Sequence, residues 1–370
     1  MSGSLASDGK GDRDVISAFL ELSVPLAQQM EAGLTTRFDD YSDFGSATSY
    51  GISYLYSPVS VLKLRANYGT SFKAPPLAYL YNKTDGGYLD VNDPKFCNSG
   101  TPAADQTCQG RTSYATYVNL AGNKELQEET AQAYNFGFIL EPADFLSFSA
   151  DVWDVQIKDI QNSEDLAELV QKEIEGADLG ASTVTRVNDP EDPLLGKISR
   201  IDNSYYNLGT LRTRGIDLEA NFDWKFDTTR TGVDVQYSNV LSRREKRTLN
   251  SEETEKVGRF GLPRYKTKTT LWGQWGDHRV SLDGITTGRM ENFSFDSDPT
   301  YGYIDPFTRY DLTYTWNHQW NGSVSLGVYN LADDITGLYL RDRQTGEKSF
   351  DDLNGDPYGR QFLLMVRQKI

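Results

Sequence analysis

The sequence predicts an all-β fold, a transmembrane antiparallel β-barrel, from three observations. Apolar and polar residues alternate over long segments, and the connections between these segments alternate between short and long. The longest apolar runs are short, such as Phe362–Val366, whereas a membrane-spanning helix needs about 20 apolar residues. We therefore expect strands rather than helices to cross the membrane.

The alternation is clearest between Gly215 and Phe226. Apolar side chains there fall on one face of an extended chain: Ile216, Leu218, Ala220, Phe222, Trp224 and Phe226. Charged and amide side chains fall on the other: Asp217, Glu219, Asn221 and Asp223. The same period of two recurs in Leu20–Leu26, Leu62–Tyr68, Leu146–Val152 and Tyr310–Trp316. Each segment predicts a strand with one apolar face and one face in contact with water.

The connections predict which strand ends share a side of the membrane. Short turns are expected near Ala27–Gln29, Ser57–Val59, Glu141–Asp144, Asp227–Arg230, Gly276–Asp277 and Asn317–Gly322. Long connections are expected at Ser71–Thr130, Gln161–Arg200, Arg243–Leu262, Glu291–Tyr303 and Asp333–Pro357. This arrangement indicates about thirteen strands of a membrane barrel, with the loops 71–130 and 161–200 on the extracellular side. A soluble β-sandwich or propeller is the alternative, but its loops need not alternate in length.

One of these loops also contains a helical pattern. Leu166, Leu169, Val170 and Ile174 have helical spacing, which predicts a short amphipathic helix packed on the barrel rim.

Composition and motifs exclude several classes of function. The net charge of -16 would repel nucleic-acid phosphates, although acidic residues can also serve only to keep a surface soluble. There is no G-x-S-x-G elbow and no phosphate-binding glycine loop, and His278 and His318 fall in or beside turns. We therefore expect neither an enzyme nor a cofactor, and no metal site.

Cys97 and Cys108 lie in a segment rich in Gly, Asp, Asn and Pro. A close pair in a polar loop favours a local disulfide in an oxidising compartment, because the paired short spacings of a zinc site are missing. Four tryptophans, Trp224, Trp275, Trp316 and Trp320, lie near the expected short turns. Trp favours the headgroup layer, so these residues are expected to form a periplasmic aromatic girdle.

Five segments resemble motifs of the TonB-dependent receptor family, in the family's order. They are Tyr68–Leu77, Lys124–Phe138, Thr213–Glu219, Val328–Asp334 and Asp356–Phe362. The second departs from the pattern, since Gln127 and Glu128 stand where Lys-Pro is usual. Each motif is weak alone, but each falls on a strand that the alternation predicts.

The resemblance implies the latter part of a 22-stranded barrel. Residues 1–370 would all belong to that barrel domain, and the family's plug domain and TonB-binding box are not found in the sequence. An isolated half barrel would leave open edges in lipid, so the chain is expected to need a missing half. The partners implied are outer-membrane lipid of a bacterial cell, an extracellular small ligand, and the TonB complex through the missing plug domain.

The ligand, if any, would meet the long loops. The loop 71–130 is rich in aromatic residues, and the candidate contacts are Tyr79, Tyr81, Tyr88, Tyr114 and Tyr117. Such rings can stack on sugars or siderophores, and they can equally pack the loop on itself.

Two functions remain open at this point. The first is TonB-energised uptake of a scarce ligand of the siderophore, haem, cobalamin or oligosaccharide class, as the resemblance implies. The alternative is a plugless outer-membrane protein that is porin-like or binds at the surface.

Overall fold

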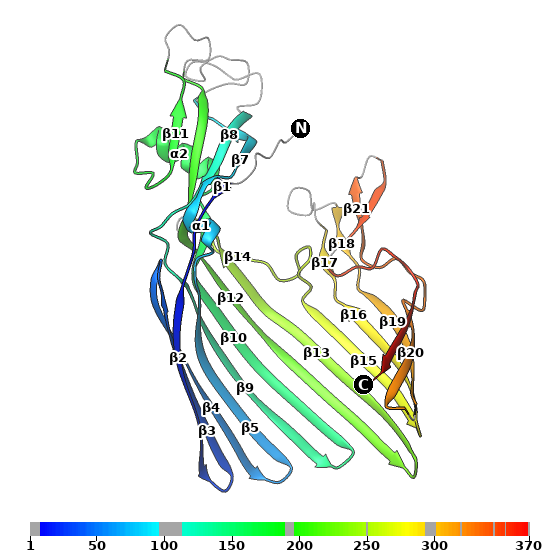
Figure 1. Cartoon of the computed structure of the whole chain (residues 1–370). Coiled ribbons are helices and arrows are strands. Elements are labelled where there is room, and N and C mark those ends of the chain that lie inside the picture. The colour runs from blue at the N-terminus through cyan, green and yellow to red at the C-terminus, as the bar shows by residue number, and fades with distance from the viewer. Residues whose placement is uncertain are drawn as a thin grey trace.

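One long, curved antiparallel sheet forms most of the molecule (Figure 1). The computed structural model describes residues 8–95, 113–188, 196–248, 251–292, 301–318, 320–342, 345–351 and 353–368. Within these residues thirteen long strands form the sheet, which we call the wall. In spatial order they are β2 (Val15–Ala27), β3 (Met30–Tyr41), β4 (Gly45–Val59), β5 (Leu62–Lys73), β9 (Glu129–Ala143), β10 (Leu146–Ser163), β12 (Ile198–Phe226), β13 (Thr229–Lys246), β15 (Tyr265–Trp275), β16 (His278–Thr287), β19 (Phe307–His318), β20 (Gly322–Tyr329) and β23 (Gln361–Gln368).

The wall has two edges. Among the described residues, β2 pairs with β3 alone and β23 with β20 alone, and no pairing joins the two edge strands to each other. One face of the wall carries exposed apolar side chains such as Phe136, Val152 and Leu326, while the other carries charged ones such as Arg65 and Asp151. The apolar face is the outward one of a membrane barrel, and the charged face lines the lumen.

The predicted strands are confirmed, with two local differences. The connection of β3 to β4 spans only residues 42–44, so short and long connections do not alternate strictly. The turn expected at Ser57–Val59 lies slightly later, because β4 continues to Val59 through an irregularity in its pairing with β5. Pro58 has no backbone N–H to donate, which such an irregularity tolerates.

A second, smaller sheet stands on the wall where the loops predicted at 71–130 and 161–200 meet (Figure 1). It consists of β7 (Gly86–Asn92), β8 (Ser113–Ala121), the first part of β12, and β11 (Thr183–Arg186). The pairing of β8 with β12 is parallel and joins Arg200 to Tyr117. We call this sheet, together with helix α2 (Leu166–Glu175), the rim sheet. Since β12 is 29 residues long, it belongs to both sheets and connects them.

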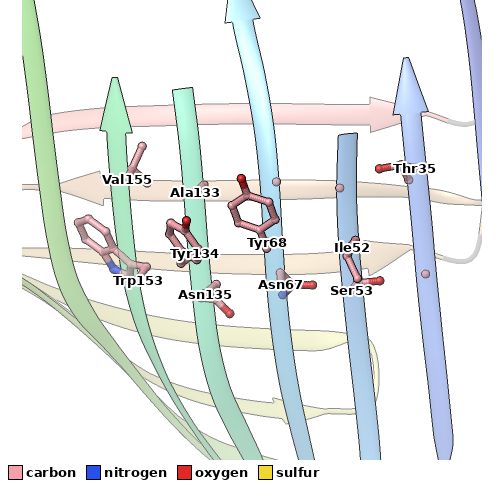
Figure 2. Close-up of a pocket in the computed structure, with 13 residues that line it drawn as sticks. Thr35, Ile52, Ser53, Asn67, Tyr68, Ala133, Tyr134, Asn135, Trp153 and Val155 are labelled. Atoms are coloured by element: carbon pink, nitrogen blue, oxygen red, sulfur yellow. The ribbon is translucent and has the colours of Figure 1, made fainter. Parts of the chain in front are cut away.

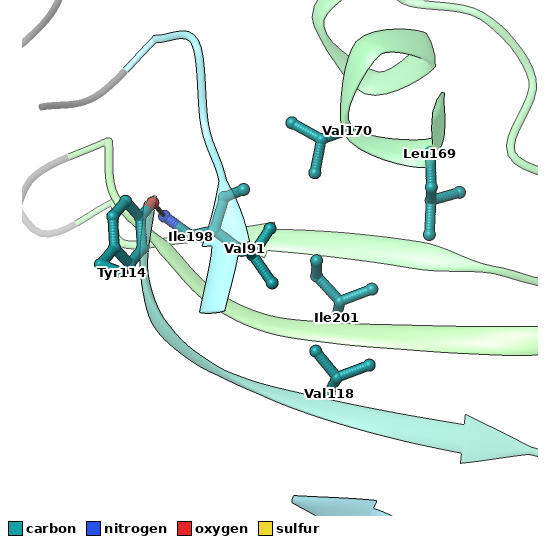
Figure 3. Close-up of a cluster of buried hydrophobic side chains, with 7 residues drawn as sticks. All are labelled: Val91, Tyr114, Val118, Leu169, Val170, Ile198 and Ile201. Carbon is teal, nitrogen blue, oxygen red and sulfur yellow. Dashed lines mark hydrogen bonds between the residues drawn. The ribbon is translucent and has the colours of Figure 1, made fainter. Parts of the chain in front are cut away.

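The rim sheet has its own apolar core (Figure 3). Leu169 and Val170 of α2 pack over Val118, Ile198 and Ile201 of the strands. The predicted helix is therefore confirmed, but it packs on a sheet made by the loops rather than directly on the barrel rim. Burial of a Leu or Ile side chain contributes about 1.5–3 kcal/mol, so this cluster stabilises the association of the two loops.

Local signals set the limits of α2. The Asp165 carboxylate accepts hydrogen bonds from the backbone N–H groups of Ala167 (2.9 Å) and Glu168 (3.2 Å) at the N-terminus. At the C-terminus Gly176 adopts φ 69°, a left-handed conformation that glycine tolerates best.

The remaining elements are short and lie outside the two sheets, apart from β14, which pairs with the end of β13. They are β1 (Asp8–Gly9), α1 (Leu77–Tyr81), β6 (Asn82–Thr84), β14 (Thr254–Glu255), β17 (Met290–Glu291), β18 (Tyr303–Ile304), β21 (Leu338–Asp342) and β22 (Glu347–Phe350). In the described part of the chain, neither helix has the length and apolar character needed to cross a membrane.

Candidate functional site

The open face of the rim sheet, opposite α2, presents an aromatic row. Tyr88 of β7 lies directly across from Tyr117 of β8, and their rings meet edge to face with centroids 5.7 Å apart. The Arg200 guanidinium of β12 lies 5.1 Å from the Tyr117 ring centroid. Tyr88 is 61% exposed, so this row, which we call the tyrosine row, is open to a ligand.

Hydrogen bonds hold the arginine of the tyrosine row in place. The Arg200 guanidinium donates to the Asp202 carboxylate, with 2.7 Å from Nε to Oδ2, and Asn119 Nδ2 donates to the same carboxylate at 2.9 Å. The bond from Arg200 lowers the pKa of Asp202 and is opposed by burial, while Asn119 adds to the lowering. Asp202 is therefore ionised at neutral pH, and the planar guanidinium keeps one orientation beside Tyr117.

A buried ion cluster supports the rim sheet near the apolar core. Arg186 of β11 donates to Asp93 (2.8 Å) and to Glu173 of α2 (2.8 Å), and Tyr114 donates to Asp93 at 2.6 Å. Tyr114 also accepts from the Ile198 backbone N–H at 2.9 Å (Figure 3). Burial, followed by the bond to Asp93, raises the pKa of Tyr114 well above its usual value. Burial would lower the pKa of Arg186, but the bonds to Glu173 and Asp93 outweigh it and raise that pKa.

The five tyrosines proposed from the sequence thus separate by their contacts. Tyr88 and Tyr117 lie in the open tyrosine row, whereas Tyr114 is buried and its hydroxyl donates a hydrogen bond to Asp93. Tyr79 stacks on Tyr205 with ring centroids 3.9 Å apart, and Tyr81 lies beneath Lys124, whose Nζ is 5.4 Å from the ring centroid. Arg200 was not predicted from the sequence. It lies at the end of the predicted loop 161–200, and its spacing of two residues from Asp202 places both side chains on one face of a strand, which is the signal that could have identified it.

A neutral hollow of about 460 Å³ lies on the lumen face of β3, β4, β5, β9 and β10 (Figure 2). Along each of these strands, small or amide residues that face the lumen alternate with residues such as Tyr68 and Tyr134 that face outward. The lumen-facing residues are Gly33, Thr35, Gly51, Ser53, Asn67, Gly69, Ala133, Asn135, Trp153 and Val155. Such a surface leaves space in the lumen without carrying a charge.

A charged hollow of about 420 Å³ adjoins it on the same face. Its lining includes Arg65, Asp151, Glu219 and Lys268. Arg65 of β5 reaches Asp151 of β10, with 2.8 Å from Nε to Oδ1, by passing over Gly137 of the strand between them. A Cβ at residue 137 would meet the Asp151 carboxylate, so only glycine permits this ion pair.

Comparison with known proteins assigns the family. Residues 2–331 match the family model described as "TonB dependent receptor-like, beta-barrel". The chain belongs to this family. Family members are outer-membrane transport receptors, not enzymes, so the wall spans the outer membrane.

Solved receptors share this fold. The siderophore receptor PirA from Acinetobacter baumannii superposes with a TM-score of 0.65 at 16% identity, covering 97% of this chain and 47% of that one. A mutant of the ferric enterobactin receptor PfeA from Pseudomonas aeruginosa gives 0.64 at 15% identity, covering 96% and 45%. The copper transporter OprC gives 0.54 at 15% identity, covering 96% and 48%. The chain thus spans about half the length of these receptors.

A local sequence similarity was also found. The vitamin B12 transporter BtuB from Vibrio cholerae serotype O1 is 36% identical over 87 residues, which are 23% of this chain and 13% of the transporter.

The four tryptophans singled out from the sequence lie at the short-turn ends of the wall strands. Trp224, Trp275 and Trp316 project from the outward face of the wall beside short turns, and Trp320 lies in the turn before β20. Their contact with lipid headgroups stays a prediction. Cys97 and Cys108 lie outside the described residues, and their disulfide also stays a prediction.

Proposed function

We propose that the wall and the rim sheet belong to a receptor that takes up a scarce ligand from outside the cell with energy supplied through TonB. The ligand is of the siderophore, haem, cobalamin or oligosaccharide class. The tyrosine row is the observation that carries the proposal. Aromatic faces stack on planar or sugar rings. The Nε and Nη2 groups of Arg200 bind Asp202, and its Nη1 group is proposed to donate to a catecholate, carboxylate or phosphate oxygen of the ligand. Tyr88 and Tyr117 are the proposed ligand contacts, while Tyr79, Tyr81 and Tyr114 pack the loops that present them.

The lumen supports the same proposal. The neutral and charged hollows lie below the rim sheet, and apart from Trp153 and Val155 their lumen-facing side chains are polar, small or charged. In this proposal the rim sheet stands on the extracellular side and selects the ligand. A plug domain outside this chain would couple release to TonB. The fold of the siderophore receptors and the local similarity to the B12 transporter support including both ligand classes in a test.

The experiment measures uptake in cells that carry or lack the gene. The panel contains iron-55 siderophores, haemin, cyanocobalamin and maltooligosaccharides, each tested with and without a working tonB gene. We expect uptake of one ligand to require both genes. Tyr88→Ala combined with Tyr117→Ala should then weaken binding of that ligand by roughly ten- to a hundredfold, as expected for two stacking contacts.

Tyr358→Ala provides the matched control, because Tyr358 is also an exposed tyrosine but belongs to the connection between β20 and β23. Uptake that does not depend on tonB, together with open-channel conductance in planar bilayers, would contradict the proposal. The porin-like alternative would then be favoured.

A further inference from the structure

Two tyrosine rings stack on each other where the rim sheet joins the wall. Tyr79 belongs to α1 and Tyr205 to the first part of β12, two elements that meet at this junction (Figure 1). Their ring centroids lie 3.9 Å apart, and the ring planes differ by only 11°. Aromatic pairs in proteins usually have centroids about 4.5–7 Å apart, so these rings are in close face-to-face contact. We call Tyr79 and Tyr205 the stacked pair.

One asparagine holds the backbones of both tyrosines. The Asn123 backbone N–H donates to the Tyr79 carbonyl oxygen at 2.8 Å, and Asn123 Nδ2 donates to the Tyr205 carbonyl oxygen at 2.8 Å. Leu80, the residue after Tyr79, is buried and anchors α1 beside this contact. The two rings are therefore held together by the surrounding fold, and their contact does not depend on a chance encounter of mobile side chains.

Other tyrosine pairs of the chain are less favourably arranged for a reaction between their rings. The Tyr88 and Tyr117 rings are 5.7 Å apart and meet edge to face at 70°. The Tyr68 and Tyr134 rings are 4.8 Å apart and tilted by 37°, and they lie on the outward face of the wall, where lipid separates them from water. The stacked pair combines the shortest of these separations with a position outside the lipid-covered face.

The surroundings of Tyr205 favour loss of an electron from its ring. Burial, followed by the neighbouring Tyr79 and the Asp85 carboxylate, raises the pKa of Tyr205, so its phenol keeps its proton at neutral pH. The same negative charge of Asp85 stabilises a ring that has lost an electron. In the part of the chain that the structure describes, neither hydroxyl of the stacked pair has a hydrogen-bond partner, so no protein group holds either phenolic proton.

We propose that the stacked pair is a modification site, at which a one-electron oxidant outside the cell joins Tyr79 to Tyr205 as dityrosine. Each phenol gives one electron to the oxidant and one proton to water and becomes a phenoxyl radical. The two radicals form a carbon–carbon bond between one Cε atom of each ring. The hydrogen on each bonded carbon is then lost as a proton while the oxygen of that ring gains one, which restores two phenols. The product has lost two electrons and two protons in total.

The bond would tie the loop 71–130 covalently to β12. A cross-link between residues far apart in sequence restricts the open forms of a structure more than its closed form. The rim sheet should therefore open less often after oxidation. This role is independent of the imported ligand, because the proposed ligand contacts, Tyr88 and Tyr117, are not modified.

The test oxidises the whole receptor, purified from outer membranes into detergent, with light-activated tris(bipyridine)ruthenium and persulfate. Tandem mass spectrometry of the digested protein then identifies the cross-linked peptides. We expect the main dityrosine product to join Tyr79 to Tyr205. Tyr79→Phe and Tyr205→Phe each keep an aromatic ring for packing but remove the phenol, so each should abolish this product. Tyr358→Phe is the control, since Tyr358 is 82% exposed and lies outside the junction.

Unfolding the receptor in urea before oxidation should remove the preference, because the preorganised contact is then lost. Dityrosine that joins other residues in the folded receptor, or the same yield of the Tyr79–Tyr205 product in urea, would overturn the proposal.

Hydrogen exchange tests the consequence of the cross-link. Oxidised receptor should exchange more slowly in α1, β7 and β8 than untreated receptor, with β13 and β15 unchanged. Tyr205→Phe treated with the same oxidant should show no such slowing, which separates the cross-link from other oxidative damage. Equal exchange before and after cross-linking would show that the bond does not restrain the rim sheet. Neither measurement involves transport, so a failure of the uptake experiment would leave this inference intact.

Discussion

The wall and the rim sheet are both built from β-strands but are stabilised in different ways. The wall leaves large apolar side chains such as Phe136 and Leu364 exposed, and outer-membrane lipid must cover them. The rim sheet instead buries Val118, Leu169 and Ile201 within itself. The rim sheet is therefore a small folded unit with its own core, attached to the wall through β12, and not a pair of loops that depend on the membrane.

The largest expected effect is that of Asp93→Ala, which should destabilise the rim sheet and leave the wall unchanged. Asp93 is fully buried and is shared by Arg186 and Tyr114, so Asp93→Ala would leave a buried guanidinium without part of its compensation. Removing one partner of a buried ion pair costs about 3–5 kcal/mol. We expect hydrogen exchange to accelerate strongly in β7, β11 and α2, with β13 and β15 unchanged.

Asp90→Ala is the control for that change, because Asp90 is an exposed carboxylate on β7, the strand that Asp93 directly follows. Equal acceleration in the rim sheet and the wall would mean that the two regions unfold together and that the comparison above is wrong.

A smaller effect is expected from a change in the wall. Gly137→Ala would place a methyl group against the Asp151 carboxylate and displace the Arg65 guanidinium from it. Hydrogen bonds to charged groups contribute about 1.5–3 kcal/mol, and the loss here falls at the lower end because the lumen is wet. Urea unfolding of the receptor in lipid vesicles, followed by Trp fluorescence, measures the loss.

Gly273→Ala is the matched control in the wall, since a Cβ at residue 273 meets no atom within 4 Å. The rim sheet should keep its hydrogen-exchange protection in both glycine variants. If Gly273→Ala destabilised the wall as much as Gly137→Ala, the replacement of any glycine within a strand would explain the loss of stability. The Arg65–Asp151 ion pair would then not be its cause.

The smallest effect concerns the helix that covers the rim core. Asp165→Ala removes the N-cap of α2 and should cost about 1 kcal/mol, seen as faster hydrogen exchange at Ala167 and Glu168 alone. Glu175→Ala, at the other end of the helix, should leave those two amides unchanged. Exchange that spread to β8 after Asp165→Ala would show that α2 and the sheet open as one unit.

Much of the wall could be predicted from the sequence, because the causes of its strands are local. Alternation from Gly215 to Phe226 predicts both the strand and which side chains face lipid, since a period of two assigns every residue to a face. The spacing of Leu166, Leu169, Val170 and Ile174 likewise predicts α2. The tyrosines of the loop 71–130 could be named, but not separated into exposed and buried ones.

The contacts that separate those residues arise from pairing between distant segments of the fold. Arg200 reaches Tyr117, and Arg186 reaches Asp93 across 93 positions in sequence, because β8 pairs in parallel with the extension of β12. The ion pair of Arg65 with Asp151 across Gly137 depends in the same way on the register of β5, β9 and β10. The strands, their faces and the helix follow from local sequence patterns, since alternation and capping act within a few residues. Register and loop pairing depend on packing between distant segments, and no local pattern encodes them.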